Sequence, residues 1–231
     1  MKYLIFLSVL VICCTKDNSI PYFKPGELSG IPRRDSVARA YFIQNLAELK
    51  ERPLRATEKG RYAVRLMMDA SIICYKYIIR VEHNDSVTTV TIKLGGDCSN
   101  KERSGLNSFE MTYSSSSSRM DSLYLAMKSR VASFDFYPGL DDPVDYVTTD
   151  GSGYLLEEWN NDKYRAVLGA NIEVLDPHLE YRGKKDMRLA IQSIKALVPP
   201  GLLIDNLSEV KTWDDLRFSV FKNSNQSSFK N

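Results

Sequence analysis

The 231-residue sequence has little histidine and lacks the short motifs by which many catalytic chains are recognised. Only His83 and His178 are present, both beside turn-forming residues, where a solvated side chain is a more ordinary interpretation than a catalytic base. No Gly-x-Ser-x-Gly, Gly-x-Gly-x-x-Gly, Walker, His-Glu-x-x-His or Cys-x-x-Cys motif occurs. Each absence counts against the one class of enzyme that its motif defines.

An excess of charge of either sign is also missing. The chain has 31 Lys and Arg against 29 Asp and Glu. Such a balance gives no long-range attraction to phosphate, so we expect no nucleic-acid partner. Hydrophobic residues make up 43% of the chain, which is enough for one well-packed core at this length.

The apolar run at the amino terminus is too short for a permanent membrane span. Lys2 gives a positive start, ten uncharged residues follow at 3–12, and a polar stretch begins after Cys14. A helix of ten residues covers about 15 Å, roughly half of the hydrocarbon core of a bilayer. This layout is typical of a signal peptide, which is removed from the mature protein.

The two cysteines that end this run resemble the lipobox of bacterial lipoproteins, in which a small residue precedes the cysteine that is acylated. Cys14 fits because the small Cys13 precedes it and Val11 lies three positions back, whereas Cys13, the alternative, would follow the bulky Ile12. The resemblance implies a signal peptide at 1–13 and a palmitate-type lipid on Cys14. The membrane, through this lipid, is then one partner.

The resemblance also implies a location in the bacterial cell envelope. Lys16 and Asp17 are similar to the charged tag that directs some Gram-negative lipoproteins to the surface, so the outer membrane or the cell surface is expected. Several acyl chains hold a protein to a bilayer essentially permanently. Two alternatives are an ordinary secretory signal that is cut elsewhere and a buried first strand.

Export would place Cys74 and Cys98 in an oxidising compartment, where they can form a disulfide. If the intervening turn centres on Asn84–Asp85, Cys74 lies opposite Gly95, and Cys98 must fold back to reach it. Two independent buried thiols remain the alternative.

Beyond the anchor, the pattern predicts an α+β fold, an antiparallel sheet of hairpins with about three packing helices. Apolar residues recur at helical spacing after Asp35 or Ser36, from Met120 to Val131, and from Lys185 to Val198. Runs rich in β-branched and aromatic residues predict strands at 62–68, 71–81, 87–94, 109–113, 154–159 and 164–168. The expected organisation is a tether at 14–33, one domain at 34–222 and a disordered tail at 223–231.

Two groups of acidic residues are the weak candidates for chemistry, and no cofactor is expected. Asp141, Asp142, Asp145 and Asp150 have oxygen ligands that suit calcium, but their spacing matches no known calcium loop, and turns favour Asp in any case. Glu157–Glu158 is a paired carboxylate of the kind used in glycoside hydrolysis. Adjacent strand residues point to opposite faces, however, so these two cannot share a substrate.

The stretch from Asp150 to Arg165 loosely resembles a hairpin of small uncharacterised exported bacterial proteins, a resemblance that brings no activity with it. The leading hypothesis is therefore a non-enzymatic binding module that recognises a protein, peptide or glycan. The alternative is an envelope hydrolase whose site is assembled from scattered residues. A purely structural envelope component is a third interpretation.

Overall fold

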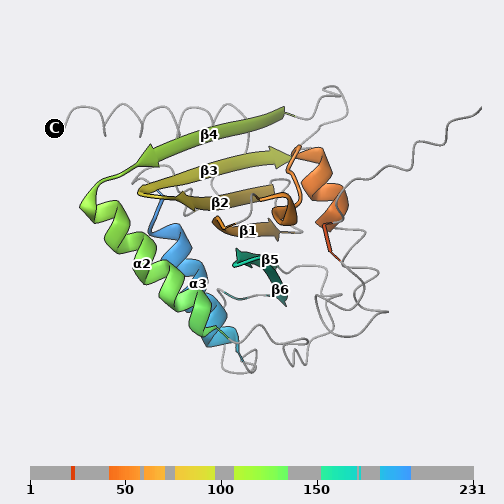
Figure 1. The fold of residues 1–231 in the computed structure, drawn as a ribbon. Helices are drawn as coiled ribbons and strands as arrows, with labels where there is room; N and C mark the ends of the chain where they lie inside the picture. Colours follow the sequence, from red (N-terminus) through yellow and green to blue (C-terminus); the bar gives the residue numbers. More distant parts are fainter. Residues whose placement is uncertain are drawn as a thin grey trace, which may run out of the picture.

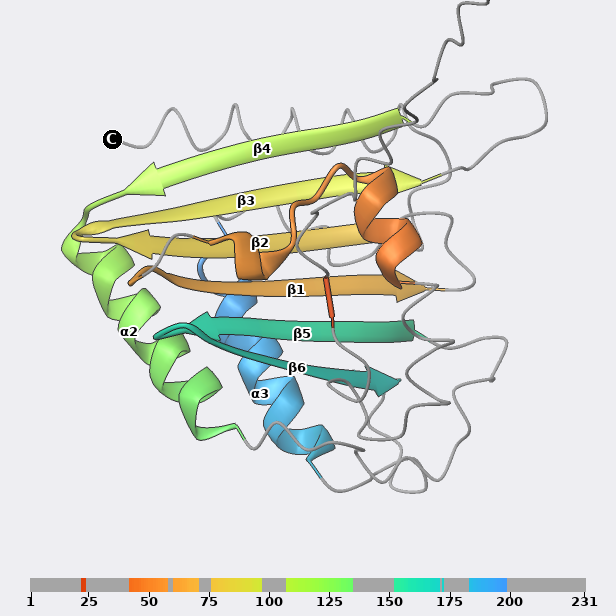
Figure 2. The ribbon, with the colours of Figure 1, turned by 45° about the vertical axis from the view of Figure 1, so that its right-hand side comes forward.

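The computed structural model describes residues 22–23, 42–57, 60–70, 76–96, 107–134, 152–170, 172 and 183–198. These residues form a six-stranded antiparallel sheet that is covered by helices on both faces (Figures 1 and 2). The α+β class, the antiparallel sheet and the packing helices predicted from the sequence are confirmed.

The described strands follow the order β4-β3-β2-β1-β5-β6 across the sheet. The first four form a meander in chain order, whereas β5 pairs with β1 and adds the second hairpin on its other side. Their bounds are β1 Tyr62–Ala70, β2 Lys76–Asn84, β3 Val87–Gly96, β4 Asn107–Ser115, β5 Ser152–Asn160 and β6 Lys163–Ala170. β1 therefore lies inside the sheet, bonded to strands from both halves of the described chain.

The helices lie on opposite faces of this sheet. Figure 2 shows the helical residues 42–48, in orange, in front of the sheet, while α2 Ser118–Ser133 and α3 Lys184–Lys195 cover the other face. A 3-10 turn, η1 Leu54–Ala56, follows the first helical segment. Within the part of the chain that the structure describes, no helix is both long and apolar enough to cross a membrane.

The hairpin of β5 and β6 forms where the sequence predicted it. Asn161 and Asp162, at its turn, both have positive φ angles, 49° and 60°. Asn and Asp tolerate this left-handed conformation better than most residues, and two such residues in succession make the tight turn that suits the twist of a hairpin.

The hairpin of β2 and β3 is present, but its predicted register is wrong. Gly95 lies opposite Lys76 rather than Cys74, so the turn centres one residue later, on Asp85 and Ser86. A shift of two in pairing leaves every side chain on the same face, so alternation of apolar residues cannot distinguish the two registers. Cys74 and Cys98 lie outside the described residues.

The serine run before α2 ends β4 and starts the helix. Ser117 is the N-cap, and its hydroxyl accepts a hydrogen bond from the amide of Met120 at 3.3 Å. The Met and aromatic stripe of this helix is core, as the spacing predicted. The buried members are Met120, Tyr124, Met127 and Val131.

The face beneath α2 and α3 carries the larger apolar core. Alternate residues of each strand point into it, including Leu66, Ile79 and Leu156, all fully buried. Contact with α3 is close at Gly169, where a Cβ would lie 2.6 Å from both Ile172 Cδ1 and Met187 Sδ. A larger residue at this position would require the side chains of Ile172 and Met187 to shift.

The opposite face carries a second, smaller core that includes residues from the predicted tether. Phe42, Leu46 and Leu49 of the helical segment pack on Met67 and other residues of the sheet, and Phe23 is fully buried with them. The sequence placed the start of the domain at residue 34. The contacts of Phe23 show that the packed unit includes chain before that boundary.

Candidate functional site

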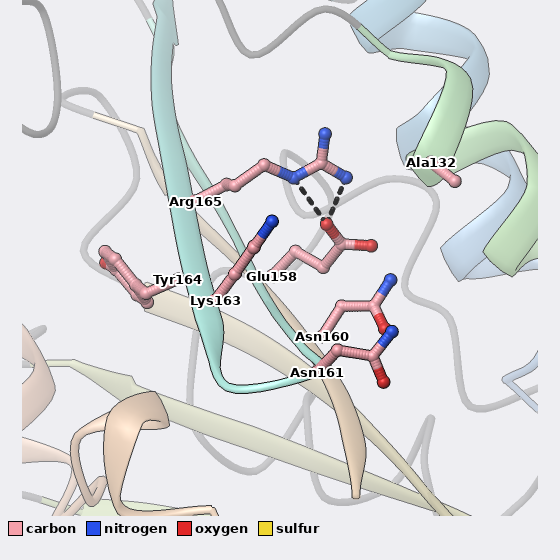
Figure 3. Close-up of a pocket in the computed structure, with 7 residues that line it drawn as sticks. All are labelled: Ala132, Glu158, Asn160, Asn161, Lys163, Tyr164 and Arg165. Carbon is pink, nitrogen blue, oxygen red and sulfur yellow. Dashed lines mark hydrogen bonds and ion pairs between the residues drawn. The ribbon is translucent and has the colours of Figure 1, made fainter. Parts of the chain in front are cut away.

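A cleft of about 600 Å³ opens where the β5–β6 hairpin meets the last turn of α2. Volumes of this size are ordinary for sites that hold small ligands. Figure 3 shows the side chains that line it, which come from both strands, the turn and the helix. They are Ala132, Glu158, Asn160, Asn161, Lys163, Tyr164 and Arg165.

Strand pairing places the charged groups of the cleft side by side. Glu158 lies directly opposite Arg165, and Asn160 opposite Lys163, across the hairpin. Directly opposite residues point to the same face, and here that face is the one covered by α2. Tyr164, one residue away, projects to the other side in Figure 3.

Glu158 forms the floor of the cleft. Its side chain is 0% exposed, and its Oε2 accepts hydrogen bonds from both Nε of Arg165, at 2.6 Å, and Nη2 of the same guanidinium. Oε1 is also buried and has no accessible surface, and the Tyr62 hydroxyl lies within hydrogen-bond reach of this carboxylate. Figure 3 shows this second oxygen turned toward Ala132 on α2.

Arg165 connects the floor of the cleft to its wall. Besides Glu158, its Nη2 contacts the carbonyl of Val131 at 3.5 Å, in the last turn of α2. The carboxylate is therefore held in one orientation by a guanidinium that is itself positioned by the helix. A fixed polar group of this kind costs less conformational entropy to use in binding than a free one.

The rim of the cleft is polar and slightly positive. Lys163 and Asn161 are exposed, and Lys163 makes no ion pair with any described residue. Two cationic side chains and one carboxylate line the cleft, so its lining carries one formal positive charge in excess. The cleft as a whole offers hydrogen-bond donors, the amide acceptors of Asn160 and Asn161, and a weak preference for anions.

The carboxylate of Glu158 also influences the core beside the cleft. Burial first, then the negative charge of Glu158 and a side-chain hydrogen bond to that carboxylate, raise the pKa of Tyr62 far above its usual value, so the phenol stays protonated. The Tyr62 hydroxyl contacts Met127 Sδ at 4.0 Å. Tyr62 thus contributes a neutral side wall rather than a second charge.

A buried ionic network occupies the opposite face of the sheet. Arg65 is completely buried and donates to Glu157 through Nε at 2.5 Å and Nη2 at 2.9 Å, the paired geometry that Arg favours with carboxylates. Arg65 also donates to the carbonyl of Arg52 at 2.7 Å. The Tyr164 hydroxyl completes the set by donating to Glu157 Oε1 at 2.8 Å.

Glu51 is the second carboxylate of this network. Its buried side chain lies 2.8 Å from Lys93 Nζ, 3.0 Å from Arg80 Nη1 and 3.3 Å from Arg65 Nη1. Burial acts to raise the pKa of Glu51, but these three cations together outweigh it and hold the pKa below its ordinary value. Because every charged group here has a partner inside the protein, the network serves packing rather than ligand binding.

The two adjacent carboxylates predicted from the sequence therefore separate as expected. Glu157 points into the ionic network and Glu158 into the cleft, so they share no site. The sequence did not reveal that both are buried, nor that each has its own arginine. The one signal available was Arg65 itself, a charged residue between the apolar residues Val64 and Leu66 of β1.

His83 differs from its predicted setting. The sequence placed it in a solvated turn, but it is the penultimate residue of β2, half-buried, with its ring stacked on Tyr124 at 3.9 Å. Its Nδ1 lies 3.0 Å from Thr88 Oγ1 and its Nε2 3.1 Å from the carbonyl of Asp85. Both ring nitrogens therefore have local partners near the β2–β3 turn.

The remaining sequence-based candidates fall outside the described residues. They are Cys13, Cys14, Cys74, Cys98, Asp141, Asp142, Asp145, Asp150 and His178. Within the described ranges, no three His, Cys, Asp or Glu side chains lie together as metal ligands do. The lipid anchor, the disulfide and the calcium loop stay predictions.

Comparison of the chain with models of known protein families and with curated proteins finds no match. Fold class does not determine function, because one architecture hosts many activities. The chemistry of the cleft is therefore the basis for a functional assignment.

Proposed function

We propose that this chain is an envelope-anchored lipoprotein whose α+β domain is a non-enzymatic binding module, with its ligand site in the cleft of Glu158 and Arg165. One observation carries the proposal: a cleft of about 600 Å³ is lined by polar side chains from both strands of the hairpin and from its turn, and the buried carboxylate of Glu158 holds Arg165 in place beside them.

The other groups in the cleft support binding by hydrogen bonds. The amides of Asn160 and Asn161 each contain a donor and an acceptor, and Lys163 adds three donors. Such groups select a polar ligand rather than an apolar one. The two-residue turn and the pairing of Glu158 with Arg165 hold them in place before the ligand arrives.

The anchor is supported by the sequence at Cys14. Cells grown with labelled palmitate should incorporate label into the wild-type protein and lose it in the Cys13→Ala, Cys14→Ala double variant. Label that persists unchanged in the double variant would contradict the lipid part of the proposal. This experiment does not depend on the cleft.

The binding part is tested by blocking the cleft. Ala132 is exposed on α2 and lines the cleft, so Ala132→Trp should fill it without disturbing the core. Ala126, exposed on the same helix but outside the cleft, gives the matched control Ala126→Trp. The detergent-solubilised full-length lipoprotein is applied to arrays of defined glycans and peptides.

A ligand that binds wild type and the Ala126→Trp variant, but not the Ala132→Trp variant, supports the cleft as the site. A ligand that binds all three proteins equally would place the site elsewhere. Conversion of the bound ligand to a product, lost in Glu158→Gln, would contradict the non-enzymatic part and favour the hydrolase alternative.

A further inference from the structure

The two edges of the sheet differ in how much surface they leave free. β6 forms one edge, and its residues 166–168 are all buried. β4 forms the other edge, at the rim of the sheet in Figure 2, and no described strand lies beyond it. Residues 112–114 of β4 are exposed. Among the described strands, β4 is therefore the one whose edge is open to another chain.

β4 lacks the features by which proteins protect an exposed edge. Its nine residues, Asn107–Ser115, include no Lys, Arg or Pro, and their pairing with β3 continues without a bulge. Lysine, proline and bulges are the usual means of preventing a second strand from adding to an edge. Alternate residues of an edge strand direct their backbone N–H and C=O groups outward, so a strand of this length offers about eight hydrogen bonds to a partner strand.

The charge pattern of β4 fits a second copy of itself. Glu110 is the one charged residue of the strand. When two antiparallel copies overlap over all nine residues, the two-fold axis passes at Met111, the middle residue, and Glu110 lies opposite Thr112 of the partner. Directly opposite residues share a face of the sheet, so the hydroxyl of Thr112 can donate to that carboxylate. No like charges lie directly opposite one another in this register.

Contacts within each chain prepare both residues for this pairing. The Glu110 carboxylate lies 3.4 Å from Lys93 Nζ, which compensates its charge. The two copies of Glu110, diagonal to one another across the axis, therefore repel weakly. The Thr112 hydroxyl lies 3.3 Å from the hydroxyl of Thr91 in β3, and this contact fixes its orientation at the edge.

We propose that the protein forms a symmetric dimer in which the β4 strands of two copies pair in antiparallel fashion about Met111. The two six-stranded sheets then join into one continuous sheet. Because both copies use the same edge, the pairing closes as a dimer and does not extend into a fibre. This interface does not depend on the proposed ligand site, since the cleft lies at the β5–β6 hairpin.

The first test measures mass and charge complementarity. Light scattering during size-exclusion chromatography of the detergent-solubilised full-length protein should give a protein mass of two chains that falls on dilution. Thr112→Glu should weaken the dimer about tenfold relative to Thr112→Lys, because it places like charges opposite Glu110 at two symmetric positions, whereas lysine places opposite charges there. Both variants lose the contact with Thr91, so a purely structural defect would affect them alike.

Cysteine cross-linking tests the register. Met111 lies opposite its own copy, with Cα atoms about 4.5–5.5 Å apart, a distance that a disulfide spans. Oxidation of Met111→Cys should therefore give a covalent dimer. Tyr113→Cys is the matched control, since its copy lies four residues further along the strand, about 13 Å away. Wild type, with its four native cysteines, gives the background.

Each result bears on the proposal. A monomer at every concentration overturns it, including a monomer whose β4 edge pairs with a peptide or with another segment of the same chain. A dimer that is equally stable in Thr112→Glu and Thr112→Lys places the interface elsewhere and also overturns it. Cross-linking through Tyr113→Cys that equals that of Met111→Cys contradicts the register about Met111.

Discussion

Both faces of the sheet are buried, but different kinds of side-chain contact fill them. Beneath α2 and α3, Leu156 and its neighbours form a continuous apolar core. On the other face, Glu157, one residue along the same strand, joins Arg65 and Glu51 in an ionic network that is equally buried. Two adjacent residues of one strand, Leu156 and Glu157, therefore belong to two different kinds of buried environment.

The difference concerns specificity more than strength. Apolar contacts tolerate small shifts, whereas a buried charge must meet its partner, because an uncompensated charge in the interior is very costly. Arg65 lies opposite Glu157 in β5 and opposite Arg80 in β2, so the two like charges need Glu51 between them. The ionic face thereby determines how the segment that carries Glu51 sits on the sheet.

The largest expected effect is on the ionic face. Glu157→Gln should lower the free energy of unfolding by about 3–5 kcal/mol, because Arg65 stays buried with one partner fewer. Urea unfolding of the mature protein, followed by tryptophan fluorescence, measures this. The double replacement Arg65→Met, Glu157→Leu should recover most of the loss, and an equal or larger loss in the double variant would show that the network stabilises the fold outright.

Leu156→Ala tests the apolar face at the neighbouring position. Leu156 is fully buried, so its truncation should cost about 3 kcal/mol in the same unfolding experiment, from lost burial and the cavity left behind. Unlike the ionic variant, this cost should not depend on salt or pH. A salt-dependent loss would mean that the two faces are coupled.

Acid should weaken the ionic face selectively. The pKa of Glu51 lies below its ordinary value of 4.5, so the folded protein releases this proton more readily than the unfolded chain does. The resulting stabilisation is present above pH 4.5 and is lost as the pH falls through the folded pKa. Unfolding free energies from pH 7 to pH 3 should therefore fall more steeply for wild type than for Glu51→Gln. Glu110→Gln, at a side chain that is 54% exposed, should follow wild type.

The smallest effect is expected at the edge of the network. Arg52 pairs with Glu82, but its side chain is 48% exposed. Exposed pairs contribute about 0–1 kcal/mol, so Arg52→Ala should change the free energy of unfolding by less than about 1 kcal/mol. A loss as large as that of Glu157→Gln would remove the distinction between the buried and exposed parts of the network.

The sequence was sufficient for elements whose signals are local. The stripe from Met120 to Val131 predicted α2, and the polar Asn161–Asp162 between apolar runs predicted the β5–β6 hairpin. The pairing of β1 with β5 was not predictable in this way, since about 90 residues separate Arg65 from Glu157. A pattern within a short stretch of sequence does not indicate which distant stretch it will pair with.

The candidate site was half predictable for the same reason. Once the hairpin is known, counting across its turn places Glu158 opposite Arg165. Ala132 lines the cleft only because of where α2 crosses the sheet, and that crossing is set by tertiary packing. In the sequence, Glu157 and Glu158 resemble a catalytic pair, and the alternation of side chains along a strand correctly predicts that they point to opposite faces. The separate surroundings of each carboxylate depend on tertiary packing.

The burial of Phe23 limits how far the domain can stand from a bilayer. Seven residues separate Cys14 from Tyr22, whose hydroxyl donates to the carbonyl of Glu51. Even fully extended, the eight steps from Cys14 to Tyr22 cover about 28 Å. With the proposed lipid on Cys14, the docking site of Tyr22 and Phe23 would be kept within that radius of the lipid headgroups. The cleft lies on the α2 side of the sheet, which is the face opposite this docking site.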